Sequence, residues 1–418
     1  MTVAAPFALS TDQQAAMDKF NLFISDPSSP VFTLSGFSGT GKSTLIKTLL
    51  DQLPAFMKTL KLINPSFKEL EVRLTATTNK AAEAFGQITG MEVSTIHSLL
   101  GLRVVTDYKT NTSSLVAKNN DTQIGLLLFV DEASFIDSAL LDRIFKGTSQ
   151  CKIVFIGDPA QLTPIKATST PVFEANFPGA HLSQVVRQAE GNPIISLSTM
   201  FRETVSSGEF FSFKPDGNAI QYMDRDTFNK AIEAEFTRPD WRYHHSKMLG
   251  WTNKCVIGYN QYVSSKVSGD PSFQTGDYAV CNSFLTIGRN SIKTDQMVCI
   301  SGISEDERVH DVLGNWFMLD YSIRAFMPKT LADRNARIKQ ARAEEDYTTV
   351  AHIESQWADL RAAYACTINK AQGSTFDKVF IDLDDISRCN SGDQIARMMY
   401  VAVSRARHQV FLTGDFVS

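Results

Sequence analysis

The sequence lacks the features of secreted, disulfide-stabilised and membrane-spanning proteins. Only six of its 418 residues are cysteines, and no two of them form a CxxC pair. No apolar run approaches the roughly 18 residues that a membrane-spanning helix needs. The first residues, MTVAAPFALS, have neither the basic start nor the apolar core of a signal peptide. We therefore expect free, buried thiols, no membrane partner and a protein that stays in the compartment where it is made.

The chain also lacks the excess of positive charge that is typical of proteins that coat nucleic acids. Its 41 Lys and Arg residues are outnumbered by 45 Asp and Glu residues, which gives a net charge of −4. This balance counts mildly against a broad basic face. It does not exclude nucleic-acid binding, because a narrow polar groove suits a motor that releases and rebinds its track in every cycle. The 43% of hydrophobic residues predict globular domains with real cores, about two to four of them.

The first third of the chain alternates short apolar runs with helical stretches, a pattern that predicts βαβ units and a parallel sheet. The candidate strands are Val31–Ser35, Val72–Ala76, Leu126–Val130 and Ile153–Ile156. Each is rich in Val, Ile, Leu or Phe and ends at a polar or glycine-containing loop. Because ligands of open α/β sheets gather at the carboxyl ends of the strands, we expect the chemistry of this region in those loops.

Two further patterns follow along the chain. The polar, turn-rich stretch between Gly101 and Gly125 predicts a small hairpin or loop inserted into the first lobe. A second αβ pattern begins near Ala180. Its expected strands are Met248–Trp251, Lys378–Leu383 and Gln409–Thr413.

The segment inside this second pattern has a different character. Residues 271–327 form short β-like runs, such as Tyr278–Cys281 and Met297–Ile300. Residues 330–360 are helical and of mixed charge, which is typical of a solvated helical hairpin or of a partner surface. We find no internal repeat that would indicate a solenoid or an array.

A phosphate-binding motif follows the first candidate strand. The residues Gly-Phe-Ser-Gly-Thr-Gly-Lys-Ser at 36–43 match GxxxxGK[ST], in which glycines let backbone N–H groups wrap the phosphates. Lys42 would reach the β- and γ-oxygens and the Ser43 hydroxyl would bind Mg²⁺. The helix expected at Ser43–Leu53 points its N-terminus at the anion. The predicted ATP-binding positions are Gly36, Gly39, Thr40, Gly41, Lys42, Ser43 and Thr44.

An acidic pair follows the apolar strand LLLFV. A carboxylate at a strand end beside a P-loop holds Mg²⁺, partly through water, and its neighbour polarises an attacking water. We therefore assign Asp131 to the metal and Glu132 to the general base. Alone the pair would be a weak signal, and the P-loop upstream makes it the expected second half of an NTPase site.

Two other segments each allow two interpretations. Gln161, in the segment GDPAQL at 157–162, either senses the γ-phosphate or belongs to a plain turn built on Gly-Asp-Pro. Gln13, in Ser10-Thr-Asp-Gln13, either completes a capping box at a helix N-terminus or recognises the adenine edge, and the two roles are compatible.

The motifs occur in a defined order along nearly the whole chain. They are LSTDQQAAM (9–17), GFSGTGKS (36–43), LTATTNKAA (74–82), STIHSLL (94–100), DEAS (131–134), GDPAQLTPI (157–165), LSQVVRQ (182–188), WTNKCVIGYN (251–260), TINKAQGSTFDKVFI (367–381) and YVAVSRARHQV (400–410). This series resembles superfamily 1 helicases, and most closely the phage Dda-like members of the branch that includes RecD.

The resemblance implies an α/β fold with two RecA-like P-loop NTPase lobes, each with a parallel sheet, and ATP between them. Lobe 1A would cover residues 1–180, with a pin-like insert 1B at 101–124. Lobe 2A would cover 181–270 and 361–418. Residues 271–360 would form accessory domain 2B, SH3-like with an added helical hairpin.

The resemblance also implies roles for single residues. Arg187 and Arg405 would reach the γ-phosphate from the second lobe, where a guanidinium stabilises transition-state charge, and Gly373 would lie at the nucleotide. Hydroxyls, amides and single lysines would hold the DNA backbone without reading its sequence. These DNA-binding residues are Thr77, Thr78, Lys80, Ser94, Thr95, His97, Asn253, Thr367, Asn369 and Lys370.

Three positions qualify this assignment. Asn369 replaces a histidine expected in the most similar family members. Phe37 is bulkier than the usual P-loop residue, so we expect its ring to pack away from the phosphates. Tyr108 is the only aromatic residue of the short insert, which leaves strand separation by a pin open.

The function implied is an ATP-dependent helicase that moves 5′-to-3′ on single-stranded DNA and unwinds forks. Its ATP cycle would close and reopen the lobes, with Mg²⁺ as cofactor. Replication or recombination proteins, including a single-strand-binding protein, are the expected partners of a monomeric motor in the cytoplasm, the host cytoplasm if the chain is phage-encoded. The alternatives are a translocase that mainly displaces bound proteins and a non-catalytic single-strand-binding scaffold. The intact catalytic residues argue against the scaffold.

Overall fold

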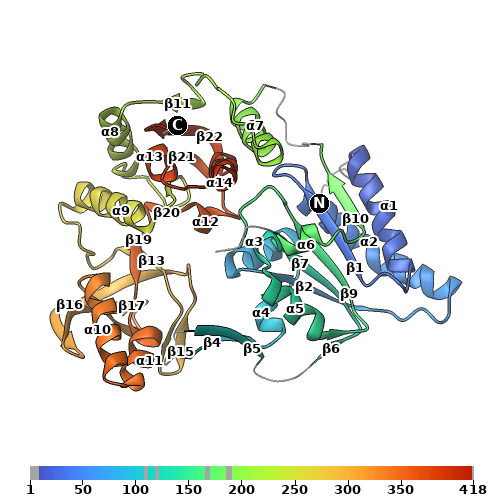
Figure 1. The fold of residues 1–418 in the computed structure, drawn as a ribbon, viewed down its shortest axis with the longest axis horizontal. Coiled ribbons are helices and arrows are strands. Elements are labelled where there is room, and N and C mark those ends of the chain that lie inside the picture. The colour runs from blue at the N-terminus through green and yellow to red at the C-terminus, as the bar shows by residue number, and fades with distance from the viewer. Residues whose placement is uncertain (1–8, 108–111, 118–121, 165–169, 185–190, 417–418) are drawn as a thin grey trace, which may run out of the picture. The chain divides into compact units, whose positions relative to one another are not determined.

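The computed structural model describes residues 9–107, 112–117, 122–164, 170–184 and 191–416 (Figure 1). The chain divides into two compact units. The first comprises residues up to Val105 and Leu115–Gly191, and the second comprises Thr106–Ser114 and Asn192–Ser418. None of the helices in the described ranges is both long enough and apolar enough to cross a membrane. All six cysteines are free thiols, as we predicted, but only Cys281 is buried and the other five are half-buried.

The first unit is built on a six-stranded, all-parallel sheet in the order β10-β1-β9-β7-β2-β3. The strands are β1 (Val31–Gly36), β2 (Glu71–Ala76), β3 (Val93–Thr95), β7 (Leu126–Asp131), β9 (Lys152–Gly157) and β10 (Gly179–Leu182). The four strands predicted in this region are confirmed to within one residue at either end. The signal is clearest in β7 and β9, where apolar residues run from Leu126 to Val130 and from Ile153 to Ile156, as is typical of strands that are buried on both faces.

Helices cover both faces of this sheet (Figure 1). They are α1 (Thr11–Ser25), α2 (Lys42–Ile63), α3 (Asn79–Thr89), α4 (Ile96–Leu99), α5 (Ser138–Lys146) and α6 (Pro171–Glu174). Side chains of β7 alternate between the two cores: Leu127 and Phe129 pack with residues of α1, α2 and α3. Leu126, Leu128 and Val130 pack with residues of α4, α5 and α6. This central strand is therefore buried on both faces, which holds the residues at its carboxyl end in place.

Helix α2 is longer than we predicted. We expected it to end at Leu53, and the next residue, Pro54, lacks a backbone donor and normally breaks a helix. The helix instead continues through Pro54 to Ile63. Its buried face continues past the proline, with Leu49, Leu53 and Met57 all in the core, and this burial outweighs the local cost.

The first unit also extends further along the chain than the predicted boundary at residue 180. Strand β10 pairs in parallel with β1, with Gly179 opposite Thr33, so it belongs to the first sheet. The stretch after Gly101 forms a two-stranded sheet of β4 (Leu102–Asp107) and β5 (Thr112–Ala117), as the polar composition predicted. Tyr108 lies outside the described residues. Two short strands further along the chain, β6 (Gln123–Ile124) and β8 (Thr148–Ser149), pair with each other in parallel.

The second unit contains a five-stranded parallel sheet in the order β11-β22-β21-β12-β20. The strands are β11 (Ile220–Tyr222), β12 (Ser246–Gly250), β20 (Ala365–Thr367), β21 (Phe376–Asp382) and β22 (Ala406–Thr413). The helices are α7 (Pro193–Ser207), α8 (Arg225–Phe236), α9 (Asn253–Ser268), α12 (Ile368–Ala371), α13 (Leu383–Ile386) and α14 (Gly392–Ser404). Phe228 and Phe236 of α8 pack on Phe380 of β21, so α8 and α9 share one buried layer on this sheet. The three strands predicted for this sheet are confirmed, although each begins two or three residues earlier than predicted and β12 and β21 end one residue earlier.

The accessory segment of the second unit is β-rich and helical, as its composition predicted. Its antiparallel sheet has the order β18-β17-β16-β13-β19, beside a hairpin of β14 and β15. The elements are β13 (Tyr278–Cys281), β14 (Leu285–Ile287), β15 (Asn290–Ile292), β16 (Met297–Val309), β17 (Val312–Leu319), β18 (Ile323–Pro328), α10 (Leu331–Ala343), α11 (Tyr347–Gln356) and β19 (Leu360–Ala362). Ile338 and Val350 of the helical hairpin pack with Phe326 and Trp357. One face of the hairpin is thus covered by the sheet and is no partner surface.

Candidate functional site

The loop after β1 has the backbone that phosphate binding requires. Gly39 and Gly41 adopt positive φ angles of 85° and 78°, which residues with a side chain rarely adopt. A Cβ atom on Gly36 would lie 2.9 Å from the Cβ of Leu182. Gly39 and Gly41 are therefore required by the loop backbone and Gly36 by the close approach of β10, and α2 begins directly after the loop at Lys42.

Lys42 lies folded across this loop. Its ammonium donates hydrogen bonds to the carbonyl oxygens of Gly36 and Phe37, at 2.7 and 2.9 Å. The hydroxyl of the buried Thr40 donates to the same Phe37 carbonyl at 2.8 Å. The ring of Phe37 packs edge-on against His181 of β10, with ring centroids 4.7 Å apart. This contact agrees with our prediction that the ring packs away from the loop interior.

Gln13 connects the first helix to the same loop. Its amide oxygen accepts a hydrogen bond from the Ser10 N–H and its own N–H donates to the Ser10 hydroxyl, which completes the predicted capping box. Its amide nitrogen donates to the carbonyls of Thr40 and Gly41, at 3.2 and 3.4 Å. The side chain is only 3% exposed. Gln13 therefore stabilises the backbone of the P-loop through its amide group, and adenine recognition remains a prediction.

The acidic pair lies where β7 ends. Burial, followed by the neighbouring Glu132 carboxylate, raises the pKa of Asp131 to about 7, against the opposing effect of the Lys42 ammonium. Glu132 has left-handed backbone angles, φ 54° and ψ 46°, and its N–H donates to the Asp131 carboxylate at 2.8 Å. Such a conformation is costly for a residue with a side chain and is typical of functional sites.

The residues at the P-loop and at the acidic pair fit a bound Mg²⁺. Asp131 is half-buried, and a carboxylate whose pKa is raised is one that a nearby cation would favour in its ionised form. Ser43 lies in the first turn of α2 and is exposed, so its hydroxyl is accessible to a ligand. The assignment of Asp131 and Ser43 to the metal stays a prediction, and their carboxylate and hydroxyl groups are of the kind that Mg²⁺ binds.

The segment after β9 forms the turn that one of its two predicted interpretations requires. Asp158 is 1% exposed, and its carboxylate accepts a hydrogen bond from the Ala160 N–H at 2.9 Å. The Gln161 N–H donates to the Asp158 carbonyl at 3.2 Å, which closes the turn. Because β9 lies between β1 and β7 in the sheet, this turn follows the strand between the P-loop and the acidic pair. The sensor role of Gln161 stays a prediction.

The predicted DNA contacts of the first unit follow β2 and β3. The Thr77 hydroxyl donates to the Glu132 carbonyl at 3.2 Å. Thr78 and Thr95 are the N-caps of α3 and α4, and their hydroxyls accept from Ala81 N–H and Ser98 N–H. Burial lowers the pKa of His97, which favours its neutral form. The remaining two, Lys80 and Ser94, lie in α3 and β3.

The predicted contacts of the second unit lie at the ends of β12 and β20. Thr367 is the N-cap of α12, and Asn369 and Lys370 belong to that helix. The Lys370 ammonium donates to Asn282 and Asp295 of the accessory segment. Asn253 begins α9, and its amide oxygen accepts from Arg361 at 2.7 Å. Gly373, with φ 77°, follows α12.

Arg405 is the C-cap of α14 and is only 6% exposed. Its guanidinium donates to the carbonyls of Val401 and Ser374, at 3.1 and 3.2 Å, and to the Ser404 hydroxyl. These bonds hold its planar group in one orientation. Arg187 lies outside the described residues.

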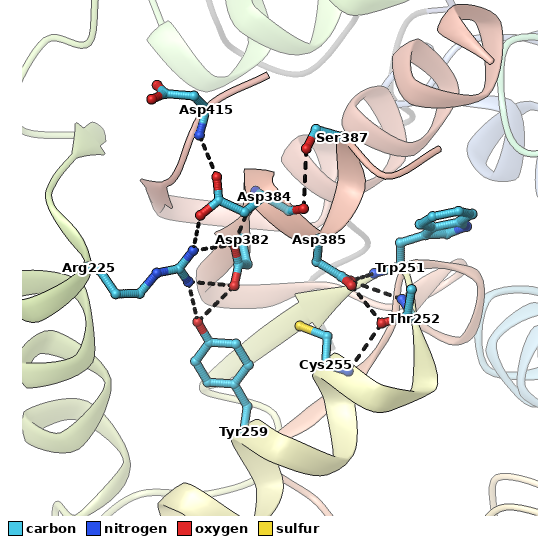
Figure 2. A network of polar contacts seen from close by, with 10 residues as sticks. All are labelled: Arg225, Trp251, Thr252, Cys255, Tyr259, Asp382, Asp384, Asp385, Ser387 and Asp415. Carbon is cyan, nitrogen blue, oxygen red and sulfur yellow. Dashed lines mark hydrogen bonds and ion pairs between the residues drawn. The ribbon is translucent and has the colours of Figure 1, made fainter. Parts of the chain in front are cut away.

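Sequence reasoning missed a polar network that supports the second unit's site (Figure 2). The buried Asp385 carboxylate accepts from the N–H groups of Trp251 and Thr252, at 2.7 and 2.9 Å, and from the Thr252 hydroxyl at 2.6 Å. It thereby fixes the turn that begins α9 beside Asn253. Arg225 pairs with Asp382 and Asp384 from the same segment. The DLDD sequence that ends β21 was the available signal.

Comparison with known proteins agrees with these motifs. A family described as AAA domain matches residues 8–224, and a family described as UvrD-like helicase C-terminal domain matches residues 362–413. The chain is 24% identical to the ATP-dependent DNA helicase dda of Enterobacteria phage T4, over 91% of this chain and 93% of that protein. It is 31% identical to the ATP-dependent RecD2 DNA helicase of Deinococcus radiodurans, over 44% of this chain and 24% of that protein.

A solved structure shows the same fold. It comes from work on DNA unwinding at forked duplexes by two coordinating Pif1 helicases, and it superposes with a TM-score of 0.51 at 15% identity. The superposition covers 99% of this chain and 93% of that one.

Proposed function

This chain belongs to the AAA-domain family and to the superfamily 1 helicases, in the branch of Dda, RecD-like and Pif1 enzymes, and we propose that it uses ATP to move 5′-to-3′ along single-stranded DNA and to unwind forked duplexes. The observation that carries this proposal is the P-loop after β1 and the acidic pair at the end of β7, on two strands that flank β9 in one sheet, in a chain whose residues 362–413 match a helicase C-terminal domain. A chain that combines an NTPase site with a helicase domain is suited to act as a motor.

The first unit supplies the chemistry at the phosphates. When ATP binds, the Lys42 ammonium exchanges its two carbonyl partners for the β- and γ-oxygens. Glu132 accepts a proton from the attacking water. Gln161 contacts the γ-phosphate and reports its loss. Mg²⁺, held by Asp131 and Ser43, neutralises phosphate charge when it is bound.

The second unit couples this chemistry to movement. Arg187 and Arg405 stabilise the charge that develops on the γ-phosphate, so hydrolysis depends on closure of the lobes. ATP must favour the closed state by several kcal/mol, about 5.5 for a shift from 1:99 to 99:1, to move the population fully. One lobe grips the strand while the other slides, and hydrolysis resets the grip.

DNA is held through its backbone. Hydroxyls such as that of Thr77, the amide of Asn253 and the ammonium of Lys370 suit phosphate contacts that carry no sequence information. The track is therefore single-stranded DNA at a fork, bound without base preference. We further propose a monomeric motor that works beside a single-strand-binding protein in replication or recombination.

An unwinding assay on forks with a 5′ or a 3′ single-stranded tail tests this function. We expect ATP-dependent unwinding only with the 5′ tail, and none by Lys42→Ala, with Lys47→Ala, an exposed lysine of the same helix, as the matched control. Unwinding from the 3′ tail would contradict the direction. Displacement of streptavidin from biotinylated DNA without unwinding would favour the translocase instead, and DNA binding without ATP turnover would favour the scaffold.

A further inference from the structure

The accessory segment contacts Lys370, one of the predicted DNA-binding residues. We call the predicted DNA-binding residues of the second unit the strand grip; they are Asn253, Thr367, Asn369 and Lys370. The Lys370 ammonium donates to the Asn282 side-chain oxygen at 2.5 Å and to the Asp295 carboxylate at 2.6 Å. Asn282 follows β13, and Asp295 lies in the turn between β15 and β16. Lys370 belongs to α12 of the RecA-like part of the same unit. The accessory segment therefore reaches the site where we propose that the DNA backbone binds.

Further polar contacts lead from Asn282 to Asn253, a second residue of the strand grip. The Asn282 side-chain nitrogen donates to the Asp359 carboxylate at 2.6 Å, and its backbone N–H donates to the Asp359 carbonyl at 2.8 Å. Arg361 pairs with Asp359 at 3.1 Å and donates to Asn253 at 2.7 Å. A continuous set of polar contacts thus joins the two predicted DNA contacts, Lys370 and Asn253, through residues of the accessory segment.

Asp295 is held in place for its contact with Lys370. Its φ angle is 64°, a left-handed conformation that Asp and Asn tolerate better than other residues with a side chain. Its N–H donates to the Cys281 carbonyl at 2.8 Å. The backbone of this turn is therefore held where the Asp295 carboxylate reaches the Lys370 ammonium.

A DNA phosphate can replace the Asp295 carboxylate as the partner of the Lys370 ammonium. A carboxylate presents an anionic oxygen to an ammonium in the way that a DNA phosphate does. The two side chains are 28% and 34% exposed, so the pair is accessible and only weakly stabilising in water. A phosphate that arrives at Lys370 therefore competes directly with Asp295.

We propose that Asp295 sets the affinity of the strand grip for DNA. Its carboxylate pairs with the Lys370 ammonium when no DNA is bound, and a phosphate of the DNA backbone displaces it. The proposal rests on the proposed DNA contact of Lys370. Asp295 lowers the affinity for single strands and thereby favours release in every cycle. Displacement also breaks a contact between the accessory segment and α12, which makes the accessory segment sensitive to DNA occupancy.

The test compares Asp295→Asn with Asp306→Asn in the full chain. Asp306 is a matched control, because it lies in the same accessory segment, has a left-handed φ of 55° and pairs with a lysine, Lys329, at 2.8 Å. Both variants remove one negative charge and keep a side chain that tolerates the turn. Binding of a fluorescent oligothymidylate is measured without nucleotide over a range of salt concentrations.

We expect Asp295→Asn to bind single strands about two- to fivefold more tightly than the control, because a competing ion pair has been removed. The slope of log affinity against log salt should steepen by up to about 0.7, the value for one ionic contact on a single strand, because Lys370 then releases a salt ion where the wild type releases Asp295. Equal affinities and slopes for the two variants, or weaker binding by Asp295→Asn, would overturn the proposal.

The variants Lys370→Ala and Lys370→Ala/Asp295→Asn separate this inference from the proposed function. Lys370→Ala should weaken binding and make the salt slope shallower, and adding Asp295→Asn should then change nothing. If Lys370→Ala leaves affinity and slope unchanged, the DNA contact of Lys370 is wrong and the inference falls with it. If Lys370→Ala weakens binding but Asp295→Asn matches its control, the grip stands and only the competition is wrong.

Discussion

The hydroxyl of Thr77 donates a hydrogen bond to the backbone carbonyl of Glu132 at 3.2 Å. In the same place the Thr77 N–H donates to the Asp131 carbonyl at 3.3 Å. A residue of the predicted DNA grip is thus bonded directly to the two residues predicted to hold the metal and activate water. A shift of the chain after β2 would move the acidic pair with it, so the proposed contact of DNA with Thr77 would change the position of the residues proposed to hydrolyse ATP.

The first prediction concerns the general base. Glu132→Gln keeps the size and the left-handed backbone but cannot accept the proton of water, so ATP turnover should fall by about 10²- to 10⁴-fold. Binding of a fluorescent ATP analogue should stay within about twofold of the wild type, since Lys42 and the loop are untouched. Glu71→Gln, at the exposed start of β2, is the control. Near-normal turnover by Glu132→Gln would refute the assignment.

The second prediction concerns the Thr77–Glu132 bond. Thr77→Val keeps the shape and removes the donor, while Thr77→Ser keeps the donor. Thr77→Val should lower the DNA-stimulated kcat for ATP about tenfold, because the base loses the bond that orients its backbone, and Thr77→Ser should restore most of it. Equal rates of ATP turnover for the two variants, measured with saturating oligothymidylate, would show that the hydrogen bond plays no part.

The third prediction concerns Asp385, which lies 3% exposed beneath the Trp251–Thr252 turn. Asp385→Ala leaves two backbone donors and a hydroxyl without their acceptor, so the free energy of unfolding should drop by about 3 kcal/mol. Asp393→Ala, which removes an exposed i,i+4 partner of Arg397, should cost less than about 1 kcal/mol. Urea unfolding followed by circular dichroism measures both, and equal losses would contradict the buried role of Asp385.

The fourth prediction concerns pH. Burial and Glu132 raise the pKa of Asp131 to about 7 in the folded chain, against 3.8 as the ordinary value. The folded state therefore binds more protons than the unfolded state between these values, and this contribution to stability is present below pH 3.8 and lost as the pH rises through 7. In EDTA and without nucleotide, Asp131→Asn should gain stability relative to the wild type across this window. Parallel unfolding free energies at pH 4.5 and 8, measured by urea titration, would contradict the raised pKa.

Much of the fold was predictable because its signals are local. The strand that becomes β7 is an apolar run up to Asp131, β9 is apolar from Ile153 to Ile156, and the glycines at 39 and 41 permit the positive φ angles of the loop. The errors also have local causes. Pro54 indicated a helix end, but burial of Met57 beyond it carries the helix onward.

The boundary at residue 180 fails for a different reason. A short strand has no signal in its own residues that says which sheet it joins. β10 is four residues long, and its pairing with β1 joins residues 146 positions apart in the chain. Only the assembled sheet decides that this strand completes the first unit.

The sequence by itself determined the identity of the chemistry, because phosphate-binding glycines, Lys42 and the acidic pair are close in the chain or at the ends of recognisable strands. Only the tertiary structure decided which residues support that chemistry. Asp385 meets Trp251 across 134 residues, and Lys370 meets Asp295 across 75. Such pairs carry no periodicity or spacing of their own, since each residue alone is an ordinary charge, and their partnership exists only once two separate segments are folded against each other.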